Sequence, residues 1–138
     1  KILKLIEKQR GLMMSKKDGK YSVKLADFLN FIAESIVEYS RHERECKAQE
    51  DLTQDILHEL ELGPADNKNK LATKFKNTRK ERRIHKDYCE IHEALVLFFE
   101  SQEGKIIRNR LTEILGAMRK QEQHKQNRYY VPRFKEDQ

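Results

Sequence analysis

The chain has 138 residues, of which 38% are charged and 37% hydrophobic, with a formal net charge of +6, no Trp, five Gly and two Pro. This composition excludes a thick apolar core and offers few chain breaks, so it favours long helices with narrow apolar seams over a sandwich or an α/β fold. No stretch approaches the roughly 18 consecutive apolar residues of a membrane span. The first residues, KILKLIEKQR, also lack the uninterrupted apolar run of a signal peptide, so we expect a cytoplasmic protein. Two cysteines are too few for a disulfide framework, so we expect reduced thiols.

Helical periodicity predicts the elements in chain order. Residues 2–14 are expected to form an amphipathic helix, which the run SKKDGK then ends. From about residue 22 to residue 62 no Gly or Pro occurs and apolar residues recur at helical spacing, which predicts one helix about 60 Å long at about 1.5 Å per residue. The stretch GPAD then supplies a terminating Gly, a Pro, and Asp66 as a cap for the next helix.

A third helix is predicted from about residue 67 to residue 101. Phe75 and Ile84 are half a turn out of phase, so we expect the buried face to change near the basic run and to continue through Ile84, Tyr88, Ile91, Leu95 and Phe98. A fourth helix should run from about residue 105 to residue 123, followed by an extended tail. We predict an all-α protein with a long antiparallel, coiled-coil-like helical hairpin and additional shorter helices, organised as residues 1–21, 22–126 and 127–138.

Charge is divided unevenly between the two long helices. Residues 22–62 hold four Lys or Arg against ten Asp or Glu, net −6, whereas residues 64–92 hold nine against four, net +5. One interpretation is internal pairing, in which Glu38, Glu43, Glu45, Glu50 and Asp51 face the basic run and set the register of the helices.

The other interpretation of the basic run is a surface for nucleic acid. With Ile84 taken as pointing inward, Arg79, Arg82 and Lys86 point outward, and the tail alternates basic with aromatic residues, as in surfaces on which bases stack. The tail could instead dock on the protein's own apolar seam. The candidate nucleic-acid-binding residues are Arg79, Arg82, Arg83, Lys86, Arg128, Tyr129, Tyr130 and Arg133.

A repeated His-x-x-x-Cys pattern suggests a metal site. His42 with Cys46, and His85 with Cys89, each share one helix face, and a turn near residue 64 places His42 opposite Tyr88. Four such ligands at one level of a hairpin would suit a structural zinc ion. The alternative is buried thiols with neutral, hydrogen-bonded histidines, and no other cofactor is expected.

Catalytic motifs are not apparent: the sequence has no Gly-rich phosphate loop and no nucleophile elbow, so we do not expect an enzyme. The stretches TQDILHELEL, RKERRIHKD, LTEILGAMRKQE and NRYYVPRF resemble small helical proteins of phages and prophages of Gram-positive bacteria, over roughly residues 40–135. That resemblance implies a phage accessory protein in the cytoplasm of a bacterial host, acting on DNA or on a host protein, and assigns no functional residue.

Two functions follow as hypotheses. The first is a non-enzymatic accessory protein that binds nucleic acid through the basic helix and the tail. The alternative is a protein-interaction module that binds a host or phage protein through the acidic stretch HERECKAQED or through the aromatic tail. A homodimer formed through an exposed apolar seam is also expected, because narrow seams alone stabilise a monomer weakly.

Overall fold

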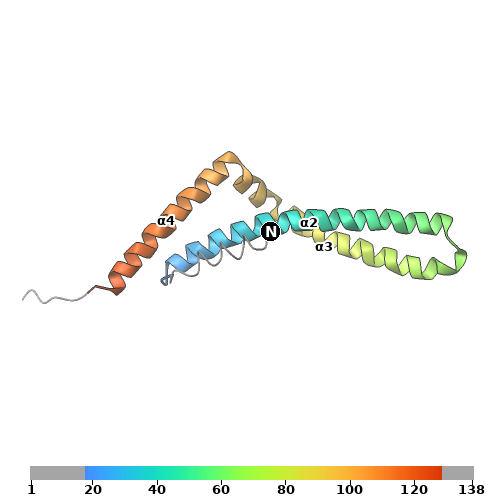
Figure 1. Cartoon of the computed structure of the whole chain (residues 1–138), viewed down its shortest axis with the longest axis horizontal. Helices are drawn as coiled ribbons and strands as arrows, with labels where there is room; N and C mark the ends of the chain where they lie inside the picture. Colours follow the sequence, from blue (N-terminus) through green and yellow to red (C-terminus); the bar gives the residue numbers. More distant parts are fainter. Residues whose placement is uncertain (1–17, 129–138) are drawn as a thin grey trace, which may run out of the picture. The chain divides into compact units, whose positions relative to one another are not determined.

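The computed structural model describes residues 18–128, and these residues form helices and contain no strand. Helix α2 spans Ser22–Leu62, a short 3₁₀ helix η1 spans Ala65–Asn67, α3 spans Lys68–Glu100 and α4 spans Gln102–Gln126 (Figure 1). The all-α prediction is confirmed. The predicted helix at residues 2–14 and most of the predicted tail lie outside the described residues. Within residues 18–128, no helix combines the length and the apolar character that crossing a membrane requires.

The turn between α2 and α3 forms where the sequence indicates. The backbone N–H of Gly63 donates to the Glu59 carbonyl at 2.8 Å, and a Cβ atom at position 63 would lie 2.5 Å from that oxygen, so only Gly fits. Pro64 follows and cannot continue the helix. The predicted cap by Asp66 is wrong: Asn67 occupies the N-cap position of α3, and no side chain caps that terminus.

The chain divides into two compact units. The first comprises residues 1–31 and 105–138, of which 18–31 and 105–128 are described. In this unit the Glu122 carboxylate of α4 accepts the backbone N–H groups of Tyr21 and Ser22, at 3.3 and 3.1 Å. It therefore caps α2, whose first N–H groups have no partner within the helix.

The second unit comprises residues 32–104 and pairs the later part of α2 with α3. Three contacts give the direction: Cys89 Sγ lies 3.8 Å from the Tyr39 carbonyl oxygen, the rings of His42 and Tyr88 stack with centroids 4.0 Å apart, and Arg82 Nε lies 2.9 Å from Glu50 Oε1. As the residue number rises along α2 it falls along α3, so the two helices are antiparallel (Figure 1). His42 lies opposite Tyr88, as the sequence predicts.

We call the contact between α2 and α3 the inner seam. Its residues recur at alternating intervals of four and three along each helix. From residue 42 to residue 62 of α2, only every third or fourth residue is not exposed, and the same spacing runs along α3. This spacing is typical of coiled coils. The inner seam consists of His42, Cys46, Gln49, Thr53, Ile56 and Leu60 on α2, and of Leu71, Phe75, Thr78, Arg82, His85, Cys89, His92, Val96 and Phe99 on α3.

The apolar stripe predicted to be buried on α3 lies mainly outside the seam, which corrects the sequence prediction. Ile84 is 57% exposed and Ile91 77% exposed, and Phe98 is exposed as well, whereas Tyr88 and Leu95 are half-buried. The predicted change of buried face near the basic run is also wrong, because the inner seam continues through it. The periodicity followed apolar residues only, while several seam positions carry polar side chains.

Candidate nucleic-acid interface

Four cations on α3 form what we call the basic face. Lys76, Arg79, Lys80 and Arg83 are exposed, and their spacing of three and four places them on one side of the helix over about two turns. Together with Phe75 and Ile84 they line one shallow depression on the surface of α3. Cationic side chains beside apolar groups on one helix face are suited to phosphate and sugar contacts.

The cations of the basic face differ from Arg82 and Lys86 of the same run in having no internal partner among the described residues. Within residues 18–128, none of the four lies within ion-pair distance of a carboxylate. Arg82, in contrast, is half-buried and holds Glu50 of α2 through Nε and Nη2, each 2.9 Å from Oε1. Lys86 Nζ lies 3.9 Å from Glu90 Oε1, one turn further along α3. The prediction that Arg82 points outward is therefore wrong, because Ile84 is not the inward direction.

Internal pairing accounts for little of the basic run. Of the five acidic residues expected to face it, only Glu50 reaches a cation of α3 in the described part of the chain. Glu38 instead pairs with Arg41 of its own helix, at 2.7 Å. Most of the positive charge on α3 thus stays available to an external anion.

Among the predicted tail contacts, only Arg128 lies within the described residues. It follows the end of α4, its side chain is exposed, and its backbone N–H donates to the Lys125 carbonyl at 3.4 Å. The other predicted residues of the tail, Tyr129, Tyr130 and Arg133, lie outside the described part of the chain.

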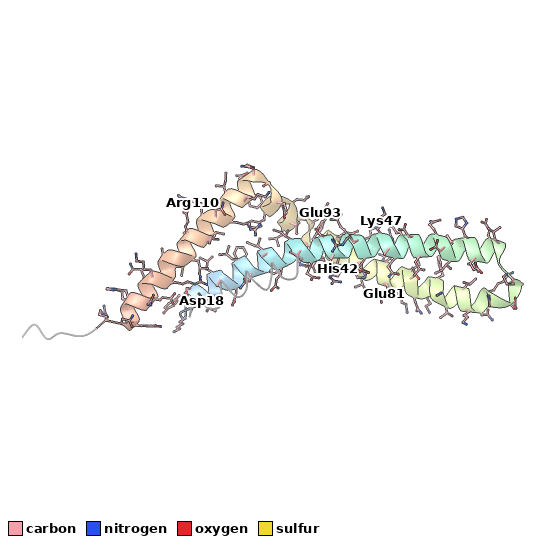
Figure 2. All side chains as sticks on the ribbon, viewed as in Figure 1. Asp18, His42, Lys47, Glu81, Glu93 and Arg110 are labelled. Atoms are coloured by element: carbon pink, nitrogen blue, oxygen red, sulfur yellow. The ribbon has the colours of Figure 1, made fainter. Side chains whose placement is uncertain are left out.

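The predicted metal ligands lie in the inner seam, where the two histidines meet directly. Figure 2 labels His42 on α2. Its Nδ1 lies 2.7 Å from His85 Nδ1, and Arg41 Nη2 donates to His42 Nε2 at 3.2 Å. Because His42 Nε2 is an acceptor, a neutral His42 carries its hydrogen on Nδ1 and donates it to His85. His85 then carries its hydrogen on Nε2, which lies 3.9 Å from Glu81 Oε2. The Arg41 contact thus makes His42 Nδ1 the donor and His85 Nδ1 the acceptor of the bond between the two rings.

Aromatic stacking extends this pair along α3. The Tyr88 ring stacks on His42 on one side and on His92 on the other, with centroids 4.0 and 3.9 Å apart. Burial lowers the pKa of His42, and the nearby Arg41 guanidinium and His85 lower it further, against an opposing effect of Glu38. A neutral His42 is consistent with the hydrogen bond that its Nε2 accepts.

The two cysteines are free thiols, both half-buried. Cys89 donates to the Tyr39 carbonyl, and burial raises the pKa of its thiol, with the Glu43 carboxylate adding to the effect. Metal ligation requires the thiolate, which such surroundings disfavour. Within residues 18–128, no three or more His, Cys, Asp or Glu side chains are grouped so that they could hold an ion. Of the four predicted ligands, His42 and His85 are in direct contact, and a zinc site that includes Cys46 and Cys89 stays a prediction.

Comparisons with protein-family models, with curated protein sequences and with solved structures find no match to this chain. A signal for the basic face is present in the sequence, because residues 76, 79, 80 and 83 follow the i, i+3, i+4, i+7 spacing of one helix face. The sequence reading missed Lys76 and Lys80 because it took the inward direction of α3 from Ile84.

Proposed function

We propose that this protein is a non-enzymatic nucleic-acid-binding protein that contacts phosphates through the basic face of α3. The observation that carries the proposal is the lack of internal pairing: Lys76, Arg79, Lys80 and Arg83 share one helix side, and none has an ion pair within residues 18–128. The resemblance to phage proteins suggests DNA in a bacterial cytoplasm as the target.

The basic face carries more positive charge than is needed to fix the register of the two helices. One cation from the same run, Arg82, already pairs with Glu50 across the two helices. Exposed cations that serve only solubility need no common side, whereas these four lie together beside the apolar Phe75 and Ile84. The basic face spans about 10 Å at about 1.5 Å per residue, which matches four successive phosphates of one strand, separated by about 3.4 Å each along the DNA axis.

The expected binding is electrostatic and independent of sequence. Four cations that neutralise phosphates of duplex DNA give a salt slope of about −3.6, so a fourfold rise in salt should weaken binding by about 150-fold. Fluorescence anisotropy of a labelled duplex and a labelled single strand, titrated at two salt concentrations, measures this. Strong binding that ignores salt would contradict the proposal.

The matched variants are Arg79→Glu with Arg83→Glu, and Arg44→Glu with Lys47→Glu. Both pairs change the net charge equally, and Arg44 and Lys47 are exposed residues of α2 (Figure 2 labels Lys47). We expect the first pair to weaken binding similarly for all sequences and to flatten the salt slope by about two or more, and the second to have a small effect. Equal losses in the two pairs would show that only net charge matters, and no binding by the unaltered protein would favour the protein-interaction alternative.

A further inference from the structure

The turn end of the α2–α3 pair carries a groove that the proposed function does not use. This groove, about 760 Å³ in volume, lies between the last turns of α2 and the first turns of α3. Its apolar lining comes from Leu52 and Ile56 on α2 and from Leu71 on α3. Leu52 is 38% exposed, so apolar surface remains open to solvent there.

The two sides of the groove carry opposite charges. Asp55 and Glu59 lie one turn apart on α2, and Lys70 and Lys74 lie one turn apart on α3. All four side chains are exposed, and none forms an ion pair with another residue of the described part of the chain. The groove is therefore an apolar strip between a carboxylate side and an ammonium side.

The opposite charges lie at matching levels along the helices. The contacts His42 with Tyr88 and Glu50 with Arg82 show how α2 and α3 align. Continued toward the turn, this alignment places Asp55 near the level of Lys74, and it places Glu59 near the level of Lys70.

We propose that the groove is occupied by the same groove of a second copy of this chain. A two-fold axis parallel to the helices sets α2 of one copy against α3 of its partner, with both turns at the same end. The carboxylate side of each copy then faces the ammonium side of the other, which gives two equivalent sets of charge contacts. The two apolar strips are buried between the copies, and the four helices form a bundle. A small apolar ligand would leave all four charges unpaired, whereas a second copy matches each of them.

The first experiment is sedimentation equilibrium of the full chain over a range of concentrations, without nucleic acid. We expect a dimer whose dissociation constant rises with salt, because exposed ion pairs are screened. A monomer at every concentration would overturn the proposal and leave the groove to a foreign partner. The result does not depend on the basic face, so this proposal and the proposed function can fail separately.

A charge exchange tests the assigned surface. Asp55→Lys with Glu59→Lys makes both sides of the groove cationic, and Lys70→Glu with Lys74→Glu makes both sides anionic. Each variant alone should self-associate at least about tenfold more weakly, because like charges then meet across the two-fold axis. An equimolar mixture of the two variants should form a heterodimer.

The control is Glu45→Lys with Asp51→Lys, which makes the same charge change at exposed positions of α2 that do not line the groove. We expect its self-association to match that of the unaltered chain. Circular dichroism of each variant reports whether the helices remain formed. Helical variants that fail to associate on mixing, or that still dimerise alone, would place the contact elsewhere and overturn the proposal.

Discussion

The inner seam and the exposed surface of α3 each depart from the composition that hydrophobicity alone would assign to them. The seam buries or half-buries polar residues such as His42, Thr53, Thr78 and Arg82, while Ile84 and Ile91 are exposed. Position relative to the neighbouring helix decides burial here. A polar residue at a seam position is buried because the backbone carries it there, provided that its polar atoms find partners.

Local hydrogen bonds make the polar seam possible. Thr53 and Thr78 each donate a hydroxyl hydrogen to the carbonyl four residues earlier, at 2.8 Å, and Arg82 pairs with Glu50. In residues 18–128, no buried side-chain nitrogen or oxygen lacks a hydrogen-bond partner. Such a seam adds less stability than an apolar one, but its few polar contacts specify the alignment of the two helices.

The largest expected effect is on the free energy of unfolding, and it comes from making the same substitution, Ile to Ala, in the inner seam and on the exposed surface of α3. Ile56→Ala removes a seam side chain that is 3% exposed, whereas Ile91→Ala removes one that is 77% exposed. We expect the first to lower the free energy of unfolding by about 2–4 kcal/mol and the second to change it by less than about 0.5 kcal/mol. Urea unfolding followed by circular dichroism measures both.

The comparison between these two variants is well matched. Both positions lie inside long helices, so the gain in helix propensity from Ile to Ala is similar and cancels. Equal losses would show that the outer side of α3 is as well packed as the seam. A larger loss at position 91 would reverse the assignment of the buried face.

A smaller effect, opposite in sign, should come from making the seam apolar. Replacing Thr53 and Thr78 by Val keeps the shape and the β-branch while removing two buried hydroxyl groups. Each hydroxyl bonds a carbonyl of its own helix, so no cross-helix partner loses a hydrogen bond. We expect the free energy of unfolding of the double variant to be higher by about 0.5–1.5 kcal/mol, because more apolar surface is buried. A less stable double variant would show that the hydroxyls contribute more than their replacement methyls.

The sequence determined the helices better than it determined their faces. The predicted helix over residues 22–62 matches α2, and the predicted third helix differs from α3 by one residue at each end, because Gly63 and Pro64 mark the turn. The face of α3 was mistaken because Ile84 is apolar but exposed. Contacts between the two helices, such as Arg82 with Glu50, depend on which face of α3 is buried. The candidate site was therefore predicted only in part. Arg79 and Arg83 belong to the basic face, whereas Arg82 does not.

We expect His42, in the inner seam, to make the stability of the α2–α3 pair depend on pH. The pKa of His42 is lowered in the folded protein from its ordinary value of 6.5, first by burial and then by Arg41 and His85. The unfolded chain therefore binds a proton at a higher pH than the folded chain does. The stability contributed by the neutral His42 is fully present above about pH 6.5, and it is lost as the pH falls through the lowered pKa.

The groups around His42 support this direction. On α2, Arg41 donates to His42 Nε2, and Glu38 Oε2 lies 3.7 Å away; on α3, His85 shares the Nδ1 contact, with the Tyr88 ring stacked alongside. A proton on Nε2 would oppose the Arg41 donor, and only Glu38, which is partly exposed to water, would favour it. Acidification should therefore weaken the α2–α3 contact.

The test compares urea unfolding near pH 7.5 and near pH 5.5 for the unaltered chain and for His42→Phe. Phenylalanine keeps a ring to stack on Tyr88 but cannot take up a proton. We expect the unaltered chain to lose stability on acidification and the variant to lose less, whatever its stability at the higher pH. Equal losses would show that another group dominates the pH dependence, and a gain on acidification would mean that the His42–His85 pair is held by a shared proton and not by two neutral rings.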